Sequence, residues 1–88
     1  GRVATDLPTV EVKEGDLKSG AALYELIVLA GLCKSNGEAR RLIKAGGARV
    51  NDAQISEEMA KVTLDEVTAE GVIKLSAGKK RHVLVRPA

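Results

Sequence analysis

Basic side chains gathered in two short segments are the residues of this sequence best suited to chemistry. Residues 34–51 carry five basic side chains and one acidic one, and residues 72–88 carry five and none. Residues 52–71, between them, carry six acidic side chains and one basic one, so a net charge of only +2 hides strong segregation. Clustered Lys and Arg side chains hold phosphates by Coulomb attraction, and Arg adds paired hydrogen bonds to phosphate oxygens. The basic residues concerned are Lys34, Arg40, Arg41, Lys44 and Arg49, with Lys79, Lys80 and Arg81 in the second segment.

Catalytic and metal chemistry have weaker candidates. Cys33 and His82 are the only cysteine and the only histidine, and a nucleophile needs a base beside it. A Cys33–His82 pair is an alternative, but two lone residues are a weak motif, and a packed thiol and a half-buried imidazole are the favoured interpretation. The carboxylates of residues 57–70 lack the spacing of metal ligands. We therefore expect no catalytic residue and no metal site.

Composition narrows the class of partner. Tyr24 is the only aromatic residue, whereas proteins that bind single-stranded nucleic acid use several aromatic faces for stacking. Structured RNA, recognised by shape and backbone contacts, is the better match. No apolar run approaches the ~20 residues of a membrane span, and no signal peptide is visible, so we expect a cytoplasmic protein that does not bind membranes.

The basic residues of the first segment belong to a helix with a clear start. Ser35 and Glu38 form the S-x-x-E pattern of a capping box, in which each side chain accepts a hydrogen bond from a backbone N–H of the first turn. Ala39, Leu42 and Ile43 share one face of this helix, and Arg40, Arg41 and Lys44 occupy the opposite face, before Gly46-Gly47 ends it. Such a basic face is equally typical of the solvated side of an amphipathic helix. The second basic segment and the separate acidic one favour phosphate binding.

The other elements predict a small α+β domain. Leu23, Leu26, Ile27 and Ala30 give residues 19–30 a buried helical stripe that ends at Gly31. Residues 10–13 predict a short strand, 14–16 a break, and 48–56 a hairpin that turns at residues 51 and 52. Residues 71–76 and 81–86 predict two strands around a basic turn, and 57–67 are ambiguous. We expect two short helices packed against a small antiparallel sheet, with residues 1–18 as an N-terminal linker or strand segment and 19–88 as the binding domain.

The segment GLCKSNGEARRLIKAGGARVNDAQI resembles the RNA-binding module named after ribosomal protein S-four. In that module a short helix is followed by G-L, a serine cap, A-R, an apolar pair, a glycine and V-N at fixed spacing. The resemblance covers residues 20–56. The matching positions are Gly31, Leu32, Ser35, Ala39, Arg40, Leu42, Ile43, Gly47, Val50 and Asn51.

The end of the chain, EGVIKLSAGKKRHVLVRPA, is similar to the C-terminus of bacterial tyrosyl-tRNA synthetases, where a G-K-K turn joins two closing strands. With it the resemblance extends over about residues 20–88, and the chain is identified as a C-terminal domain of that family. The sequence departs from the family pattern at Asn36, at Asp52 and at His82-Val83, where a basic residue, a glycine and aromatics are common. The positions that carry this second likeness are Gly78, Lys79, Lys80, Leu84, Val85 and Arg86.

The resemblance implies a non-catalytic domain that needs no cofactor and grips the anticodon stem and long variable arm of tRNA-Tyr. The parent enzyme, a homodimer, would use ATP and tyrosine in its own catalytic domain, which is the second expected partner. Two alternatives remain: a stand-alone structured-RNA or ribosome-binding module, and a protein–protein docking domain whose interface is the acidic segment 52–71. The RNA-binding residues implied are Lys34, Ser35, Arg40, Arg41, Lys44, Arg49, Asn51, Lys79, Lys80 and Arg81.

Overall fold

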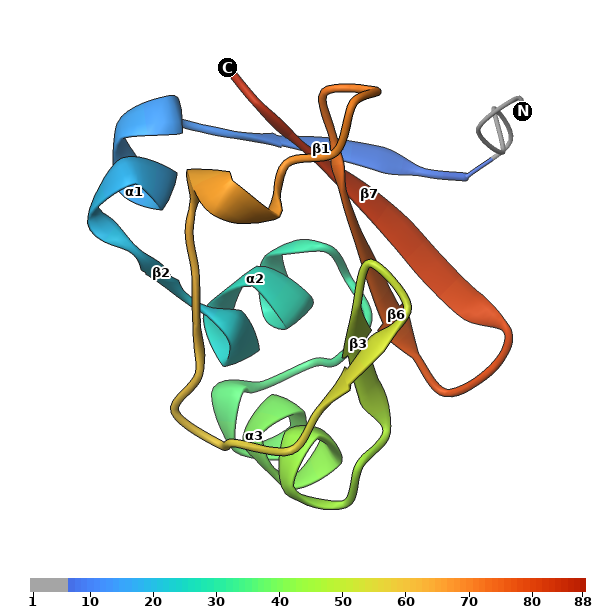
Figure 1. The fold of residues 1–88 in the computed structure, drawn as a ribbon. Helices are drawn as coiled ribbons and strands as arrows, with labels where there is room; N and C mark the ends of the chain where they lie inside the picture. Colours follow the sequence, from blue (N-terminus) through green and yellow to red (C-terminus); the bar gives the residue numbers. More distant parts are fainter. Residues whose placement is uncertain (1–6) are drawn as a thin grey trace.

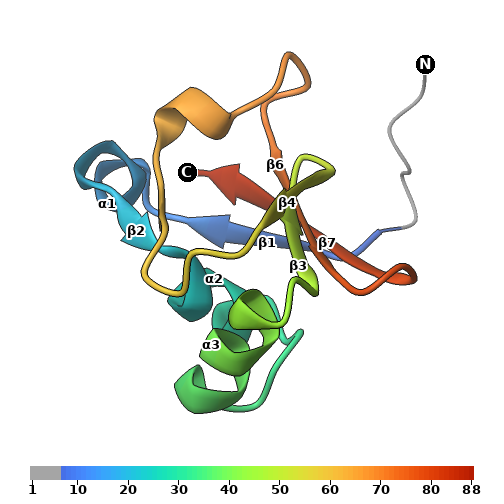
Figure 2. The same ribbon diagram turned by 60° about the horizontal axis from the view of Figure 1, so that its bottom comes forward.

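Three short helices and a mixed five-stranded sheet make up residues 7–88, the part of the chain that this computed structural model describes (Figures 1 and 2). The strand order is β1-β7-β6-β3-β4, and β2 pairs with β5 in a separate two-stranded ribbon. The elements are β1 (Thr9–Val12), α1 (Glu14–Ser19), β2 (Ala21–Ala22), α2 (Leu23–Leu29), α3 (Asn36–Lys44), β3 (Ala48–Val50), β4 (Ala53–Ile55), β5 (Lys61–Val62), the 3₁₀ turn η1 (Leu64–Glu66), β6 (Ile73–Ala77) and β7 (Arg81–Pro87).

The core is aliphatic and lies between the helices and one face of the sheet. Leu17, Leu23, Leu26, Ile27, Ala39 and Ile43 come from the helices and are buried against alternate residues of β3, β6 and β7. Alternation along a strand places every second side chain on the opposite face. The outer face of the sheet is thereby left to Arg49, Lys74, Ser76 and His82, and this face matters for the site below.

The predicted α+β class and both hairpins are confirmed. Asn51 and Asp52 have φ of 51° and 72°, the left-handed pair that a two-residue hairpin turn requires. The sheet differs from the expected antiparallel one at β1, which runs parallel to β7 with Glu11 opposite Arg86. An ion pair of 2.7 Å joins these two side chains. Parallel pairing links residues about 75 positions apart, so no local pattern predicts it.

The N-terminal half contains the main errors of the sequence prediction. The helix expected over residues 19–30 begins at Leu23, because Gly20 has a φ of 95° and residues 21 and 22 are extended against β5. The expected break at residues 14–16 is wrong: α1 begins at Glu14 and buries Leu17 completely. The ambiguous segment 57–67 becomes β5 and η1.

The expected division of the chain after residue 18 stays a prediction. Of the residues assigned there to an N-terminal linker or strand segment, 9–12 form β1 and 14–18 belong to α1, which ends one residue further on at Ser19. Residues 1–6 lie outside the described residues.

Candidate nucleic-acid interface

The cap and the buried face of α3 fix which of its side chains reach the surface. Ser35 is the N-cap, and its Oγ accepts a hydrogen bond from the Glu38 N–H at 3.1 Å. The Glu38 carboxylate accepts from the Lys34 N–H at 2.6 Å, one residue before the cap, so the predicted capping box is present in a shifted form. Ala39 and Ile43 are both 0% exposed, which leaves the basic side chains of α3 on the solvent side.

Arg40 differs from the other basic residues of α3 because it already has partners. Its Nε donates to the Glu58 carboxylate at 2.6 Å, and its guanidinium lies 5.8 Å from the centre of the Tyr24 ring. Glu58 belongs to the acidic segment, so Arg40 ties that segment to the helix and part of its charge is neutralised. A phosphate would have to share this guanidinium with Glu58.

Arg41 and Lys44 are exposed, and within residues 7–88 neither makes an ion pair. The same holds for the side chains of Lys34, Arg49, Lys79 and Lys80, all of which are exposed. No carboxylate of the described residues lies within ion-pair distance of these six groups, so none of them would have to give up an ion pair to bind a phosphate. They are the strongest candidates for phosphate contacts.

Backbone pairing joins the second basic segment to the first. The Gly78 N–H donates to the Gly47 carbonyl at 2.8 Å, which attaches the β6–β7 turn to the junction between α3 and β3. The Arg81 guanidinium donates to the Gly31 carbonyl at 3.2 Å and so reaches the loop before α3. The turn that carries Lys79 and Lys80 therefore lies beside both loops that flank α3.

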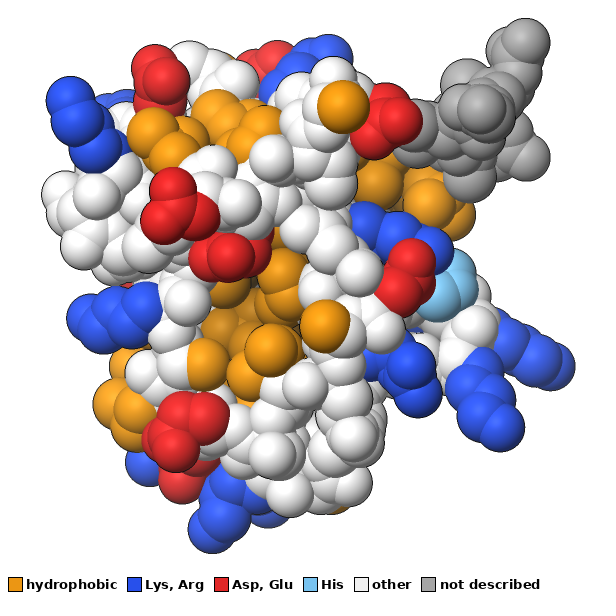
Figure 3. Space-filling view, viewed as in Figure 1, with side chains coloured by type: hydrophobic (Ala, Val, Ile, Leu, Met, Phe, Trp, Pro, Cys, Tyr) orange, Lys and Arg blue, Asp and Glu red, His pale blue; other side chains and the backbone are white. Residues whose placement is uncertain are grey.

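Charge is distributed unevenly over the surface in Figure 3. Several Lys and Arg side chains project at the lower and right edges, near α3 and the β6–β7 turn, and others lie at the left and top edges, whereas most Asp and Glu side chains surround a central apolar patch. Arg49 lies in β3, the strand that follows α3, and is exposed on the outer face of the sheet. It pairs across the sheet with Ser76 in β6, and Ser76 pairs with His82 in β7, so the three side chains form one row on the outer face.

Asn51 has a structural role. Its side chain donates to the Glu66 carbonyl at 2.6 Å and accepts from the Lys74 N–H at 2.9 Å, which connects the β3–β4 turn to η1 and β6. Its neighbour Asp52 pairs with the Lys74 ammonium at 3.1 Å. The Asn51 amide is thus occupied within the fold.

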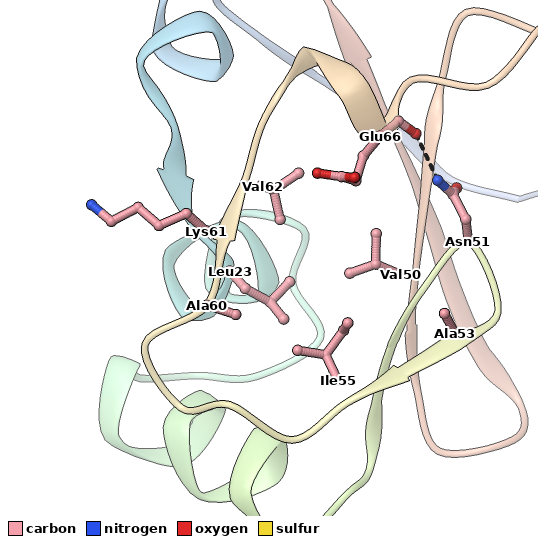
Figure 4. Close-up of a pocket in the computed structure, with 9 residues that line it drawn as sticks. All are labelled: Leu23, Val50, Asn51, Ala53, Ile55, Ala60, Lys61, Val62 and Glu66. Carbon is pink, nitrogen blue, oxygen red and sulfur yellow. Dashed lines mark hydrogen bonds between the residues drawn. The ribbon is translucent and has the colours of Figure 1, made fainter.

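The central patch of Figure 3 is a pocket of about 380 Å³ that β5 borders on one side. Figure 4 shows the side chains of Leu23, Val50 and Ile55 pointing into it, while the Lys61 ammonium points away. Its remaining lining comes from Asn51, Ala53, Ala60, Val62 and Glu66. An apolar hollow with a carboxylate at its edge is poorly suited to phosphate and is distinct from the basic surface.

The arrangement gives no support to chemistry at Cys33. Burial and the Glu38 carboxylate raise the pKa of the Cys33 thiol, although the Arg81 guanidinium opposes the rise, so the thiol keeps its proton at neutral pH. Both ring nitrogens of His82 lie against other groups, Ser76 Oγ and the Lys79 carbonyl. Among residues 7–88, no three His, Cys, Asp or Glu side chains come close enough together to hold a metal ion.

Comparison with known proteins identifies the family. A sequence family described as the tyrosine–tRNA ligase SYY-like C-terminal domain matches residues 2–85. The chain belongs to this family. The tyrosine–tRNA ligase of Nitrobacter winogradskyi is 54% identical over the whole chain, and that of Rhizobium meliloti is 53% identical over 99% of it. The chain spans about a fifth of the length of these curated relatives, 21% in both cases.

A solved relative shows the same fold. The solution structure of a tyrosyl-tRNA synthetase C-terminal domain superimposes with a TM-score of 0.71 at 31% identity, covering 94% of this chain and 80% of that one. The resemblance to the synthetase C-terminal domain is therefore confirmed. Within residues 7–88, no helix is long and apolar enough to cross a bilayer.

Three contacts in this domain do not follow from the sequence. Glu58 and Tyr24 hold Arg40, and Ser76 is bonded to His82, but none of these contacts follows from local spacing. The start of η1 did carry a signal. Thr63 and Glu66 have the T-x-x-E spacing of a capping box, and both of its hydrogen bonds are present.

Proposed function

We propose that this domain binds tRNA-Tyr through the surface formed by α3, Arg49 and the β6–β7 turn. Arg41, Lys44, Arg49, Lys79 and Lys80 supply the main phosphate contacts, with Lys34 and Arg81 at the edge and Arg40 shared with Glu58. Ser35 and Asn51 act through the fold, as helix cap and turn anchor. The observation that supports this assignment best is the Gly78–Gly47 hydrogen bond, which brings two basic segments of a ligase-family chain together.

The RNA elements we assign to this surface are the anticodon stem and the long variable arm. Base-paired RNA offers its phosphates and 2′-hydroxyls at regular spacing, and a nearly aromatic-free surface suits such contacts. The domain would hold the tRNA far from the reaction and orient its acceptor end toward the catalytic domain of the parent chain.

The parent chain is proposed to be a cytoplasmic, homodimeric tyrosine–tRNA ligase. Its relatives carry that name, and about four-fifths of their length lies outside this chain. Activation of tyrosine with ATP and its transfer to tRNA belong to that remaining part. The 88-residue domain itself is proposed to have no catalytic residue and no cofactor.

The mechanism makes a quantitative prediction about salt. Each phosphate neutralised by a protein cation releases condensed counterions, so the five main contacts give a slope of log K against log[salt] of roughly −3.5 to −4.5. Arg41→Gln/Lys44→Gln should remove two contacts and make the slope less steep by about 1.5. Gln keeps helix propensity, which separates the loss of charge from a loss of helix.

The assay is fluorescence anisotropy with a labelled hairpin of the tRNA-Tyr variable arm, at several salt concentrations. The matched control is Lys13→Gln/Lys18→Gln, which removes two exposed charges beside or within α1, away from α3 and the β6–β7 turn (Figures 1 and 2). We expect the control to bind like the unmodified chain. Equal losses in both variants would mean that only net charge matters and would remove this surface from consideration.

A protein-docking domain is the second candidate function. The apolar pocket bordered by β5 is open to the surface, and Met59, which precedes the pocket residue Ala60, is 54% exposed. Apolar burial weakens little with salt, whereas phosphate binding weakens steeply. A partner that stays bound at high salt after nuclease treatment, and is released by Ile55→Lys, would favour docking.

A further inference from the structure

We propose that His82 is a positioning residue for RNA binding: it holds the β6–β7 turn so that Lys79 and Lys80 face the phosphates. This inference rests on the proposed function. His82 lies on β7 directly opposite Ser76 of β6, and its ring contacts the turn at the Lys79 carbonyl. Nδ1 lies 2.7 Å from Ser76 Oγ, and Nε2 lies 3.1 Å from the Lys79 carbonyl oxygen.

The Lys79 carbonyl determines the role of Nε2. A carbonyl oxygen can only accept, so Nε2 must carry a hydrogen and donate it to Lys79. In the neutral ring Nδ1 then accepts from the Ser76 hydroxyl. Ser76 is 1% exposed, and within residues 7–88 the His82 ring is the only hydrogen-bond partner of its hydroxyl. The hydrogen bond to His82 therefore also gives the buried Ser76 hydroxyl a partner.

The bond to Lys79 matters because of where it lies. Three residues, 78–80, join the strands, and Gly78 has a φ of 74°. The Gly78 N–H is fixed by Gly47 at one end of the turn, and the Arg81 side chain is fixed by Gly31 at the other. Nε2 of His82 fixes the carbonyl in the middle. That carbonyl belongs to the peptide between Lys79 and Lys80, so its orientation sets the directions of both side chains.

An ordered turn favours binding because less conformational entropy is lost when the lysines meet phosphates. Without the His82 bond, the two charges remain but their positions spread. We therefore predict that loss of the His82–Lys79 hydrogen bond lowers the affinity for RNA only while Lys79 and Lys80 are present. The number of charges on the domain does not change.

Two substitutions distinguish the hydrogen bond of the ring to Lys79 from its hydrogen bond to Ser76. His82→Gln keeps an N–H donor at the position of Nε2, whereas His82→Asn keeps a polar atom beside Ser76 but cannot reach Lys79. We expect His82→Asn to weaken binding of the variable-arm hairpin about three- to tenfold, the usual effect of one hydrogen bond. His82→Gln should stay within about twofold of the unmodified chain. Thermal melts check that each variant is folded at the temperature of the binding assay.

A double-mutant cycle with Lys79→Gln/Lys80→Gln carries the decisive test. If His82 acts through the lysines, His82→Asn weakens binding in the unmodified chain and has no further effect in the lysine-free background. Additive losses would show that His82 contacts RNA directly or acts on the whole fold, and would overturn the positioning role.

Amide relaxation without RNA tests the same inference independently of binding. In His82→Asn, the order parameters of residues 78–81 should fall while those of α3 stay unchanged. In His82→Gln, the order parameters of residues 78–81 should equal those of the unmodified chain. Unchanged order in the turn would overturn the proposal. If instead Lys79→Gln/Lys80→Gln binds RNA like the unmodified chain, the turn is not part of the interface, and the proposed function fails there first.

Discussion

Substitution of Arg40 distinguishes a structural role of the basic side chains on α3 from a role in RNA binding. The Arg40–Glu58 ion pair is short, 2.6 Å, but its side chains are 46% and 27% exposed, so water screens it. A pair of this kind contributes about 0.2–1 kcal/mol, and a partly exposed cation–π contact such as that with Tyr24 adds about 0.5–1 kcal/mol. Arg40→Gln should therefore lower the free energy of unfolding by about 1 kcal/mol.

For a domain of this size, about 1 kcal/mol corresponds to a fall in Tm of about 4–8 °C. Glu58→Gln removes the ion pair and keeps the contact with Tyr24, so its Tm should fall by about half as much. The two variants differ in RNA binding. Glu58→Gln frees the Arg40 guanidinium for a phosphate and should tighten binding, whereas Arg40→Gln should leave the salt slope almost unchanged.

Circular dichroism melts and anisotropy titrations at several salt concentrations measure both effects. Arg41→Gln is the matched control on the same helix. It should leave Tm within about 2 °C, because Arg41 has no ion-pair partner within residues 7–88, and should reduce the salt slope by about 0.7–0.9. If Arg40→Gln reduces the slope in the same way and leaves Tm unchanged, the reasoning about the Glu58 pair is refuted.

Three further predictions concern single residues. Asn51→Ala should cost about 1–3 kcal/mol of stability in urea unfolding, since two hydrogen bonds are lost at a left-handed residue, and an unchanged midpoint would contradict the anchor role. Asp52→Gly should change stability by less than about 1 kcal/mol, because relief at a φ of 72° offsets the loss of an exposed ion pair, and it should tighten RNA binding by removing a carboxylate. The raised pKa of Cys33 means that the unfolded chain releases the thiol proton first, so stability is complete below the unfolded pKa and falls as pH rises through the folded one. Alkylation by iodoacetamide should accordingly need a higher pH in the folded chain than in urea, and identical pH profiles would show that the fold does not shift the thiol.

Local patterns predicted the parts of the fold that local physics determines. The Ser35 cap, the stop at Gly46 and the turn at Asn51-Asp52 each depend on a few neighbouring residues, and each is confirmed in the structure. The buried faces of α2 and α3 followed from spacing alone. The start of α2 did not, because Ala21 and Ala22 fit a helix by propensity and are extended only because β5 pairs with them.

Long-range contacts account for the rest. The β1–β7 pairing and the Arg40–Glu58 ion pair join residues distant in sequence, and nothing near either residue indicates its partner. The candidate site was predictable as a set of basic residues, but not as a geometry. Sequence could not show that Arg40 is paired, that the Asn51 amide is occupied, or that Gly78 is bonded to Gly47.

An amide chemical-shift titration with the tRNA-Tyr variable-arm hairpin, at low and moderate salt, tests the central claim most directly. We expect shifts in residues 34, 41–49 and 78–82 that grow together with RNA and fade as salt rises. Shifts centred on residues 52–71, or no shifts at low salt, would contradict an RNA-binding surface formed by α3 and the β6–β7 turn.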